Sequence, residues 1–242
     1  MTKIDEDYEA WEMFPQHRWI FNKFELSLKL GYQCGPACVP IPKTGEYIIR
    51  PIYNLYGMGV GARKTFLRSL EDRDAIIEHK FIPPGYFWCE WFNGNHYSID
   101  YQWTDEGRGG VHSHWSPTCT AIGQVGSNIQ QFSHWEKIKN KYHQLPNWLD
   151  SFYDCKELNI EYKDDKILEI HLRTGDDFLH KDPIGTEIKP VWNRDIEGGL
   201  NKYKQLLASD GWEYFSNTNQ EPFDASGYIK DPKIGYLKRC KL

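Results

Sequence analysis

Two short segments in the middle of the chain, residues 158–162 and 168–173, alternate apolar and polar side chains. This alternation is typical of β-strands that bury one face and leave the other face polar. A short polar turn, residues 164–166, separates the two segments, so together they predict an antiparallel hairpin. Such a hairpin determines which side chains share a face, and no other part of the sequence constrains the fold as strongly.

The polar face of this hairpin carries two glutamates. With three residues in the turn, Glu161 lies directly across from Glu169. Facing carboxylates repel each other, so the pair needs a counter-charge. A divalent cation meets this need, and Mg²⁺ commonly binds one or two carboxylates together with phosphate oxygens. His171 and Arg173 extend the same face. The simpler interpretation is the solvated outer face of a hairpin.

Length and composition indicate a folded globular protein. The 242 residues fit one domain or two tightly joined lobes, and 40% of them are hydrophobic. A net charge of −5 argues against general attraction to nucleic acid or anionic membranes. No signal sequence and no apolar stretch of about 18 residues is recognisable. The six cysteines form no CxxC pair, so we expect a cytoplasmic protein with reduced thiols and no membrane partner.

The remaining patterns predict strands with few helices between them, which is an α+β arrangement. Residues 1–13 resemble a polar lead-in, and residues 15–30 have helical spacing. Asn93–Gly94 predicts a hairpin, and Pro117 predicts an edge strand or a bulge. We expect strands at 46–52, 86–92, 96–103 and 111–123, and helices at 135–142 and 197–209.

A glycine-rich run follows the strand expected at 46–52. Gly57, Gly59 and Gly61 alternate with other residues, and glycine lets backbone N–H groups approach phosphate oxygens closely. The run lacks the Walker ending and the dinucleotide spacing, so a plain flexible turn fits equally well. Arg50 lies among isoleucines just before this run and needs either an anionic partner or a route to solvent. Pro51 keeps Arg50 extended.

The order of these parts resembles the ATP-grasp superfamily over roughly residues 20–175. A lysine on an early helix is followed by a strand with a cation before a proline, and then by a loop of small residues. An aromatic strand and the carboxylate hairpin come last. The resemblance implies an α+β, ATP-grasp-like fold with two small lobes of antiparallel sheets and a nucleotide cleft between them. Residues 14–178 would form the nucleotide-binding region, and residues 179–242 an extension on the same globule.

The resemblance also implies a role for each motif residue. The implied activity is ATP-dependent ligation, in which a small-molecule or peptide carboxylate becomes an acyl phosphate that an amine or similar nucleophile attacks. ATP and Mg²⁺ are the implied cofactors. The implied metal ligands are Glu161, Glu169 and His171. The implied catalytic residues are Arg173 and Arg50. The residues implied to contact the nucleotide are Lys23, Arg50, Gly57, Gly59, Gly61, Glu90, Phe92 and His96.

Two other functions remain open. The sequence departs from the family pattern at Arg50, His96 and His171, where the family has lysine, glutamate and asparagine. These departures favour a catalytically degenerate binding module, which nucleotide hydrolysis with Mg²⁺ would distinguish from an enzyme. Ten Trp and fifteen Tyr also suggest stacking on bases. Aromatic residues dominate protein cores, however, and the acidic net charge makes nucleic acid an unexpected partner.

Overall fold

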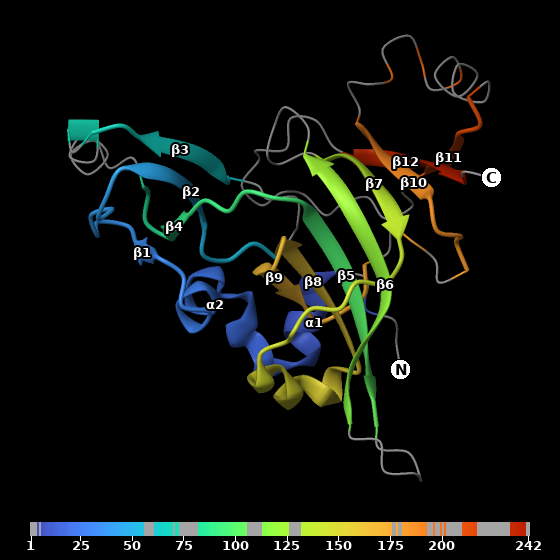
Figure 1. Cartoon of the computed structure of the whole chain (residues 1–242), viewed down its shortest axis with the longest axis horizontal. Coiled ribbons are helices and arrows are strands. Elements are labelled where there is room, and N and C mark those ends of the chain that lie inside the picture. The colour runs from blue at the N-terminus through green and yellow to red at the C-terminus, as the bar shows by residue number, and fades with distance from the viewer. Residues whose placement is uncertain are drawn as a thin grey trace.

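Two antiparallel sheets and a few helices make up the computed structural model, which confirms the expected α+β class (Figure 1). The structure describes residues 4, 6–55, 61–69, 71–72, 82–105, 113–125, 132–175, 178, 181–192, 196, 199, 201, 210–216 and 233–240.

The smaller sheet has four strands in the order β1-β4-β2-β3. Its strands are β1 (Cys34–Pro36), β2 (Gly45–Pro51), β3 (Arg63–Leu67) and β4 (Tyr86–Glu90). Alternate side chains of β2 point inward, so Tyr47 and Ile49 are fully buried against Trp88 and Leu67. The expected strands at 46–52 and 86–92 are therefore confirmed to within two residues.

The larger sheet has eight strands in the order β11-β12-β10-β7-β6-β5-β8-β9. They are β5 (His96–Thr104), β6 (His114–Val125), β7 (Phe132–Ile138), β8 (Glu157–Lys163), β9 (Lys166–His171), β10 (Thr186–Trp192), β11 (Glu213–Ser216) and β12 (Lys233–Cys240). The C-terminal strands continue the sheet at one end, while the glutamate hairpin forms the edge at the other end (Figure 1). Pro117 lies at an irregularity in the β5–β6 pairing, as expected.

Four helical segments cover the apolar face of the hairpin end of this sheet: α1 (Asp7–Met13), η1 (Pro15–Phe21), α2 (Lys23–Lys29) and η2 (Asn147–Cys155). The polar lead-in expected at 1–13 is therefore wrong, because residues 7–13 form α1. The single helix expected at 15–30 is two segments. Asn22 separates them, since its side chain accepts a hydrogen bond from the Glu25 N–H at 3.0 Å and caps α2.

Two further expectations are wrong for a physical reason. Asn93–Gly94 does not close a hairpin, because β4 and β5 belong to different sheets. This segment connects the sheets instead, and the N–H of Asn95 donates to Asp164 in the hairpin turn at 3.0 Å. Residues 132–138 form β7, because pairing with β6 and β10 outweighs the helical spacing. The helix expected at 197–209 lies outside the described residues except for 199 and 201.

The structure also bears on the expected chemical environment. All six cysteines are free thiols, as expected from their spacing. None of the helices in the described part of the chain is long and apolar enough to cross a bilayer.

Candidate functional site

Glu161 and Glu169 face each other across β8 and β9, as the sequence predicts. The turn holds only two residues, Asp164 and Asp165, with Asp164 at a φ of 47° as two-residue hairpin turns require. A bulge restores the predicted pairing, because Leu168 is an extra, unpaired residue on β9. The glutamates thus share one face of the sheet edge.

The protein itself supplies the counter-charge for Glu169. Lys23 Nζ lies 2.5 Å from Glu169 Oε1, and Arg50 Nη1 lies 3.5 Å from the same oxygen. The second guanidinium nitrogen of Arg50 donates to the carbonyl of the bulged Leu168 at 3.2 Å. Both cationic side chains are almost buried, with exposed fractions of 9% for Lys23 and 11% for Arg50. At Glu169 the counter-charge that the sequence requires is therefore present within the protein.

The two cations reach Glu169 from different elements. Lys23 begins α2, and its backbone N–H donates to the Ile52 carbonyl at 2.9 Å, which anchors α2 beside the end of β2. Arg50 lies on β2 of the smaller sheet, with its guanidinium 5.3 Å from the ring centroid of Phe87. Arg50 Nε is buried without a hydrogen-bond partner in the described part of the chain. The smaller sheet, α2 and the edge of the larger sheet therefore meet at Glu169.

Glu161 has a different partner. His96 at the start of β5 donates from Nε2 to Glu161 Oε2 at 3.0 Å. The His96 ring meets the edge of Trp135 at 5.3 Å between centroids, across the side-chain-free position of Gly123. Burial raises the pKa of Glu161, but the hydrogen bond from His96 and the nearby Lys23 outweigh this effect and hold the pKa below its usual range. Glu161 is therefore an anion at neutral pH.

A third carboxylate, Asp7 of α1, completes the cluster and was missed in the sequence. Its oxygens lie 2.7 Å from His171 Nδ1 and 3.0 Å from Arg173 Nε, and the residue is 3% exposed. Burial raises the pKa of Asp7, but His171 and Arg173 more than offset this and lower it to about 2. For His171, burial disfavours the charged ring and lowers the pKa, but the adjacent Asp7 carboxylate has the larger effect, so the pKa of His171 is raised. The spacing of Asp7, Ala10 and Phe14 is helical, so periodicity could have revealed α1, although not its contacts.

The donor set at the hairpin suits a hard cation only in part. Glu161 and Glu169 offer carboxylate oxygens, which Mg²⁺ prefers. His171 Nε2 lies 4.0 Å from a Glu161 oxygen and 3.8 Å from a Glu169 oxygen. The raised pKa of His171 favours its protonated ring, which must lose a proton before it can ligate a metal. The glutamates fit Mg²⁺ together with phosphate oxygens, and metal ligation by all three residues stays a prediction.

A second polar group extends the same face of the sheet. Asp100 on β5 accepts hydrogen bonds at 2.8 Å from the Asn159 side chain and at 2.7 Å from the Gly175 N–H. Asn159 pairs with His171 in the β8–β9 register and also donates to Ser98 at 2.8 Å. These contacts fix the backbone that follows Arg173.

The expected adenine contacts lie where the chain passes from β4 to β5. The side chain of Glu90 accepts from the Gln33 N–H at 2.8 Å, and its own N–H donates to the Gln33 carbonyl at 2.9 Å. The rings of Phe92 and Tyr32 pack edge to face, with 4.7 Å between their centroids. Glu90 therefore fastens β4 to the segment after α2, and contact of this region with adenine stays a prediction.

The expected phosphate loop is described only at its end. Gly57 and Gly59 lie outside the described residues. Gly61 has a φ of +80°, and a Cβ there would collide with the Tyr86 hydroxyl, so this position requires glycine.

Comparison with known proteins gives a match in fold. No family model matches the chain, and no curated protein matches its sequence. The ADP complex of an N5-carboxyaminoimidazole ribonucleotide synthetase matches with a TM-score of 0.55 and 13% identity, over 97% of this chain and 73% of that chain. The ATP complex of the Aspergillus clavatus synthase matches at 0.50 and 11%, over 97% and 74%. The synthetase of Thermus thermophilus matches at 0.50 and 10%, over 96% and 74%. At this identity the likeness concerns the fold alone.

Proposed function

We propose that this chain, which has an ATP-grasp fold, is an ATP-dependent ligase that activates a carboxylate as an acyl phosphate for attack by an amine or similar nucleophile. One observation carries the proposal. Cations from α2 and the smaller sheet, Lys23 and Arg50, converge on Glu169, which faces Glu161 across the hairpin of the larger sheet. The solved structures that share the fold include complexes with ADP and with ATP.

In this proposal Lys23 and Arg50 bind the nucleotide phosphates. Arg50 presents a planar fork that matches two phosphate oxygens, and its unpartnered Nε offers a further donor among the described residues. Both cations contact Glu169 in the structure, so phosphate oxygens would replace this carboxylate as their partner.

The glutamates, once released, are suited to hold Mg²⁺. A bound Mg²⁺ neutralises charge that develops during phosphoryl transfer. Glu161 is kept anionic by His96, and Glu169 lies directly opposite, so the carboxylates of both residues face the same space beside the hairpin. Arg173, oriented by Asp7 through Nε, is assigned to the substrate carboxylate or the transferred phosphoryl group.

Thermal unfolding with ATP or ADP, each with and without Mg²⁺, tests nucleotide binding, because a ligand that binds the native state raises its stability. Glu169→Gln should lose the Mg²⁺-dependent part of the shift, whereas the exposed Glu157→Gln on β8 serves as the matched control. Ligase activity is tested with ATP, a panel of carboxylates, and hydroxylamine as the nucleophile, which converts acyl phosphates to hydroxamates. Absence of any shift with every nucleotide would contradict the proposal.

A catalytically inactive nucleotide-binding module is the second candidate, and the ion pairs of Glu169 favour it. Lys23 and Arg50 already neutralise this carboxylate within the protein, so the cluster is balanced without a metal. A thermal shift with ATP, combined with no ADP release and no hydroxamate across the panel, would identify this function.

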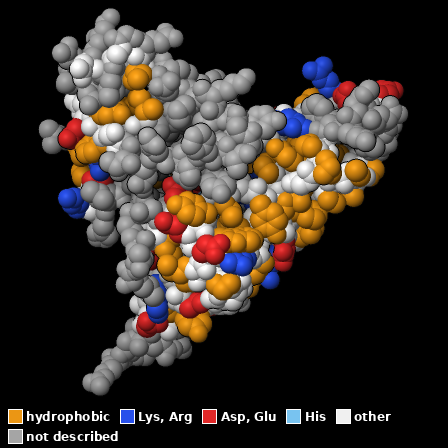
Figure 2. Space-filling model, turned by 180° about the vertical axis from the view of Figure 1, so that it is seen from behind, with side chains coloured by type: hydrophobic (Ala, Val, Ile, Leu, Met, Phe, Trp, Pro, Cys, Tyr) orange, Lys and Arg blue, Asp and Glu red, His pale blue; other side chains and the backbone are white. Residues whose placement is uncertain are grey.

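Nucleic acid remains an unexpected partner. Figure 2 shows basic and acidic side chains mixed on the visible face, with no continuous basic area among the residues it colours as described. A nucleic-acid backbone requires a concentration of Lys and Arg. Salt-dependent binding of single-stranded DNA or RNA would overturn this exclusion.

A further inference from the structure

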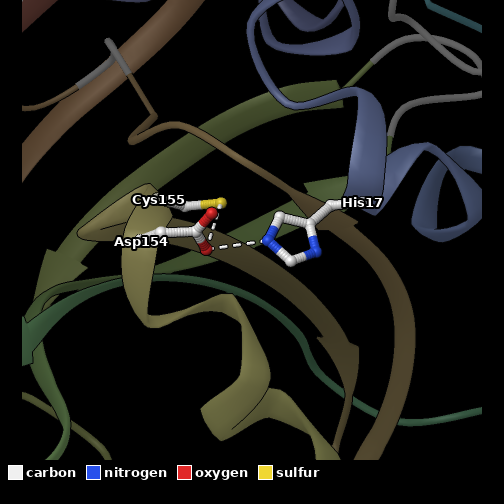
Figure 3. Close-up of side chains that lie close together, drawn as sticks. All are labelled: His17, Asp154 and Cys155. Carbon is white, nitrogen blue, oxygen red and sulfur yellow. Dashed lines mark hydrogen bonds and ion pairs between the residues drawn. The ribbon is translucent and has the colours of Figure 1, made fainter.

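A second cluster of possible ligands lies away from the glutamate hairpin, where η1 meets the end of η2. It consists of His17, Asp154 and Cys155, and its three donor atoms all lie within 4.8 Å of one another. Figure 3 shows the imidazole and the thiol converging on the same carboxylate. His17 Nε2 lies 2.7 Å from Asp154 Oδ1, and Cys155 Sγ lies 4.0 Å from that oxygen.

We propose that His17, Asp154 and Cys155 form a binding site for Zn²⁺ that is independent of the nucleotide site. Imidazole nitrogen, thiolate sulfur and carboxylate oxygen are the ligands of protein zinc sites, and a thiolate favours Zn²⁺ over Mg²⁺ or Ca²⁺. Three protein ligands leave a fourth position, which water or another group fills. The side chain of Asp154 is 36% exposed, so the ion has access from solvent.

Two of the three separations between donor atoms lie near those of tetrahedral zinc. Tetrahedral zinc with bonds of about 2.0 Å to nitrogen and oxygen and about 2.3 Å to sulfur separates N from O by about 3.3 Å and S from O by about 3.5 Å. The observed separations of 2.7 Å and 4.0 Å lie on either side of these values. The third separation, between His17 Nε2 and Cys155 Sγ, is no more than 4.8 Å, and tetrahedral zinc places these atoms about 3.5 Å apart, so rotation of the His17 or Cys155 side chain brings them to the ion.

The surroundings orient the ligands as the outer groups of a metal site do. The His17 ring packs on Phe152 at 4.4 Å between centroids. Gln16 donates to the second oxygen of Asp154 at 2.8 Å, which leaves the oxygen between His17 and Cys155 to face the ion. Hydrogen bonds to ligating carboxylates are typical of the outer shell of metal sites. The site would join two segments 137 residues apart in the sequence.

Two alternatives explain the observations less well. A nucleophilic role for Cys155 does not fit. Burial, and to a smaller extent the nearby Asp154 carboxylate, raises the pKa of its thiol, whereas a nucleophilic cysteine needs a lowered pKa. The other set of close ligands, His134, Glu136 and Glu187, already contains a cation, since Arg239 Nη2 lies 2.6 Å from a Glu187 oxygen. The described contacts of Asp154 are with His17, Gln16 and Cys155, none of which is a permanent cation.

The test titrates the full chain with Zn²⁺ against a chromophoric chelator and repeats the titration with Co²⁺, whose thiolate complexes absorb strongly in the near ultraviolet. We expect one equivalent to bind in competition with the chelator, with a thiolate–Co²⁺ band. Cys155→Ser should abolish the band, and Asp154→Asn should weaken Zn²⁺ binding at least tenfold. Cys38→Ser, which removes an exposed thiol elsewhere, and Glu169→Gln should leave both unchanged.

Several outcomes would overturn the site. These are no Zn²⁺ binding by the wild-type chain, binding without a thiolate band, a band that persists in Cys155→Ser, or binding that Glu169→Gln removes. If Cys155→Ser fails to fold, Asp154→Asn tests the same site, because an unchanged Zn²⁺ affinity in that variant would also overturn it. The zinc titration contains no nucleotide, and the nucleotide assays contain no zinc, so failure of the zinc site and failure of the proposed ligase function are distinguishable.

Discussion

Replacing Glu169 by Gln removes the one charge that Lys23 and Arg50 share, while it keeps the size of the side chain. Breaking a buried ion pair from one side typically costs about 3–5 kcal/mol. Glu169 is 21% exposed, and the amide oxygen of Gln still accepts a hydrogen bond, so we expect a loss at or just below the lower end of this range, about 2–3 kcal/mol. For a chain of this length each kcal/mol lowers Tm by about 2–4 °C, which gives a decrease of about 4–12 °C.

The same change should alter nucleotide binding in opposite directions with and without metal. Lys23 and Arg50 no longer have to leave a carboxylate, so metal-free ATP should stabilise Glu169→Gln more than it stabilises the wild-type chain. The added stabilisation on supplying Mg²⁺ should disappear, because the variant has lost one of two facing carboxylates. Differential scanning fluorimetry with ATP plus chelator, and with ATP plus Mg²⁺, measures both effects.

Glu157→Gln is the matched control, because it removes a glutamate from the same hairpin at an exposed position. Its Tm and its response to ATP should equal those of the wild-type chain. The reasoning is refuted if ligand-free Glu169→Gln melts at the wild-type temperature, or if ATP stabilises both proteins equally with and without Mg²⁺. The first result would show that the ion pairs are energetically neutral, and the second that Glu169 does not face the nucleotide.

Three further changes test other parts of the cluster. Arg50→Ala should weaken ATP binding about tenfold to a hundredfold in calorimetry, the value of a charge-assisted hydrogen bond, and an unchanged Kd would remove Arg50 from the phosphate site. Asp7, with its pKa lowered to about 2, contributes stability that is present above about pH 4 and lost as the pH falls towards 2. The free energy of unfolding of Asp7→Asn, measured with urea at pH 7, should therefore be about 2 kcal/mol lower than that of the wild-type chain. The difference should shrink near pH 2, and a difference independent of pH would contradict this. Gly123→Ala should lose about 1–3 kcal/mol by overpacking, because a Cβ there lies 2.6 Å from the Trp135 ring, and an unchanged Tm would show that the ring moves freely.

The shared face of Glu161 and Glu169 is predictable because it depends on side-chain period, whereas their direct pairing depends on the turn and on the bulge. Alternation requires the apolar side chains of both strands to face the core, and a shift of one residue would reverse every side chain. The turn was predicted one residue too long, yet the bulge at Leu168 restored the same pairing. The bulge itself has no signature in the sequence, although it presents the carbonyl that Arg50 binds.

Contacts across long sequence separations could not be predicted. Asp7 and His171 are 164 residues apart, and no local pattern links α1 to β9. Likewise, Arg50 among isoleucines required an anionic partner, but the sequence left both a phosphate and a carboxylate open. β7 was mistaken for a helix because its apolar residues have helical spacing, whereas the ladders with β6 and β10 determine its conformation. Tertiary pairing outweighs propensity for such short segments.

The charges of the cluster nearly cancel, because three carboxylates face three permanent cations and one imidazole with a raised pKa: Asp7, Glu161 and Glu169 against Lys23, Arg50, Arg173 and His171. The triphosphate of ATP alone would take the cations and leave the carboxylates unbalanced in a largely buried site. Mg²⁺ alone would compete with cations that already hold Glu169. When ATP and Mg²⁺ bind together, phosphate oxygens would replace Glu169 as the partner of Lys23 and Arg50. The metal would in turn replace these two cations as the partner of the glutamates. Under the proposed function, the ion pairs of Glu169 would therefore favour joint binding of nucleotide and metal over binding of either one.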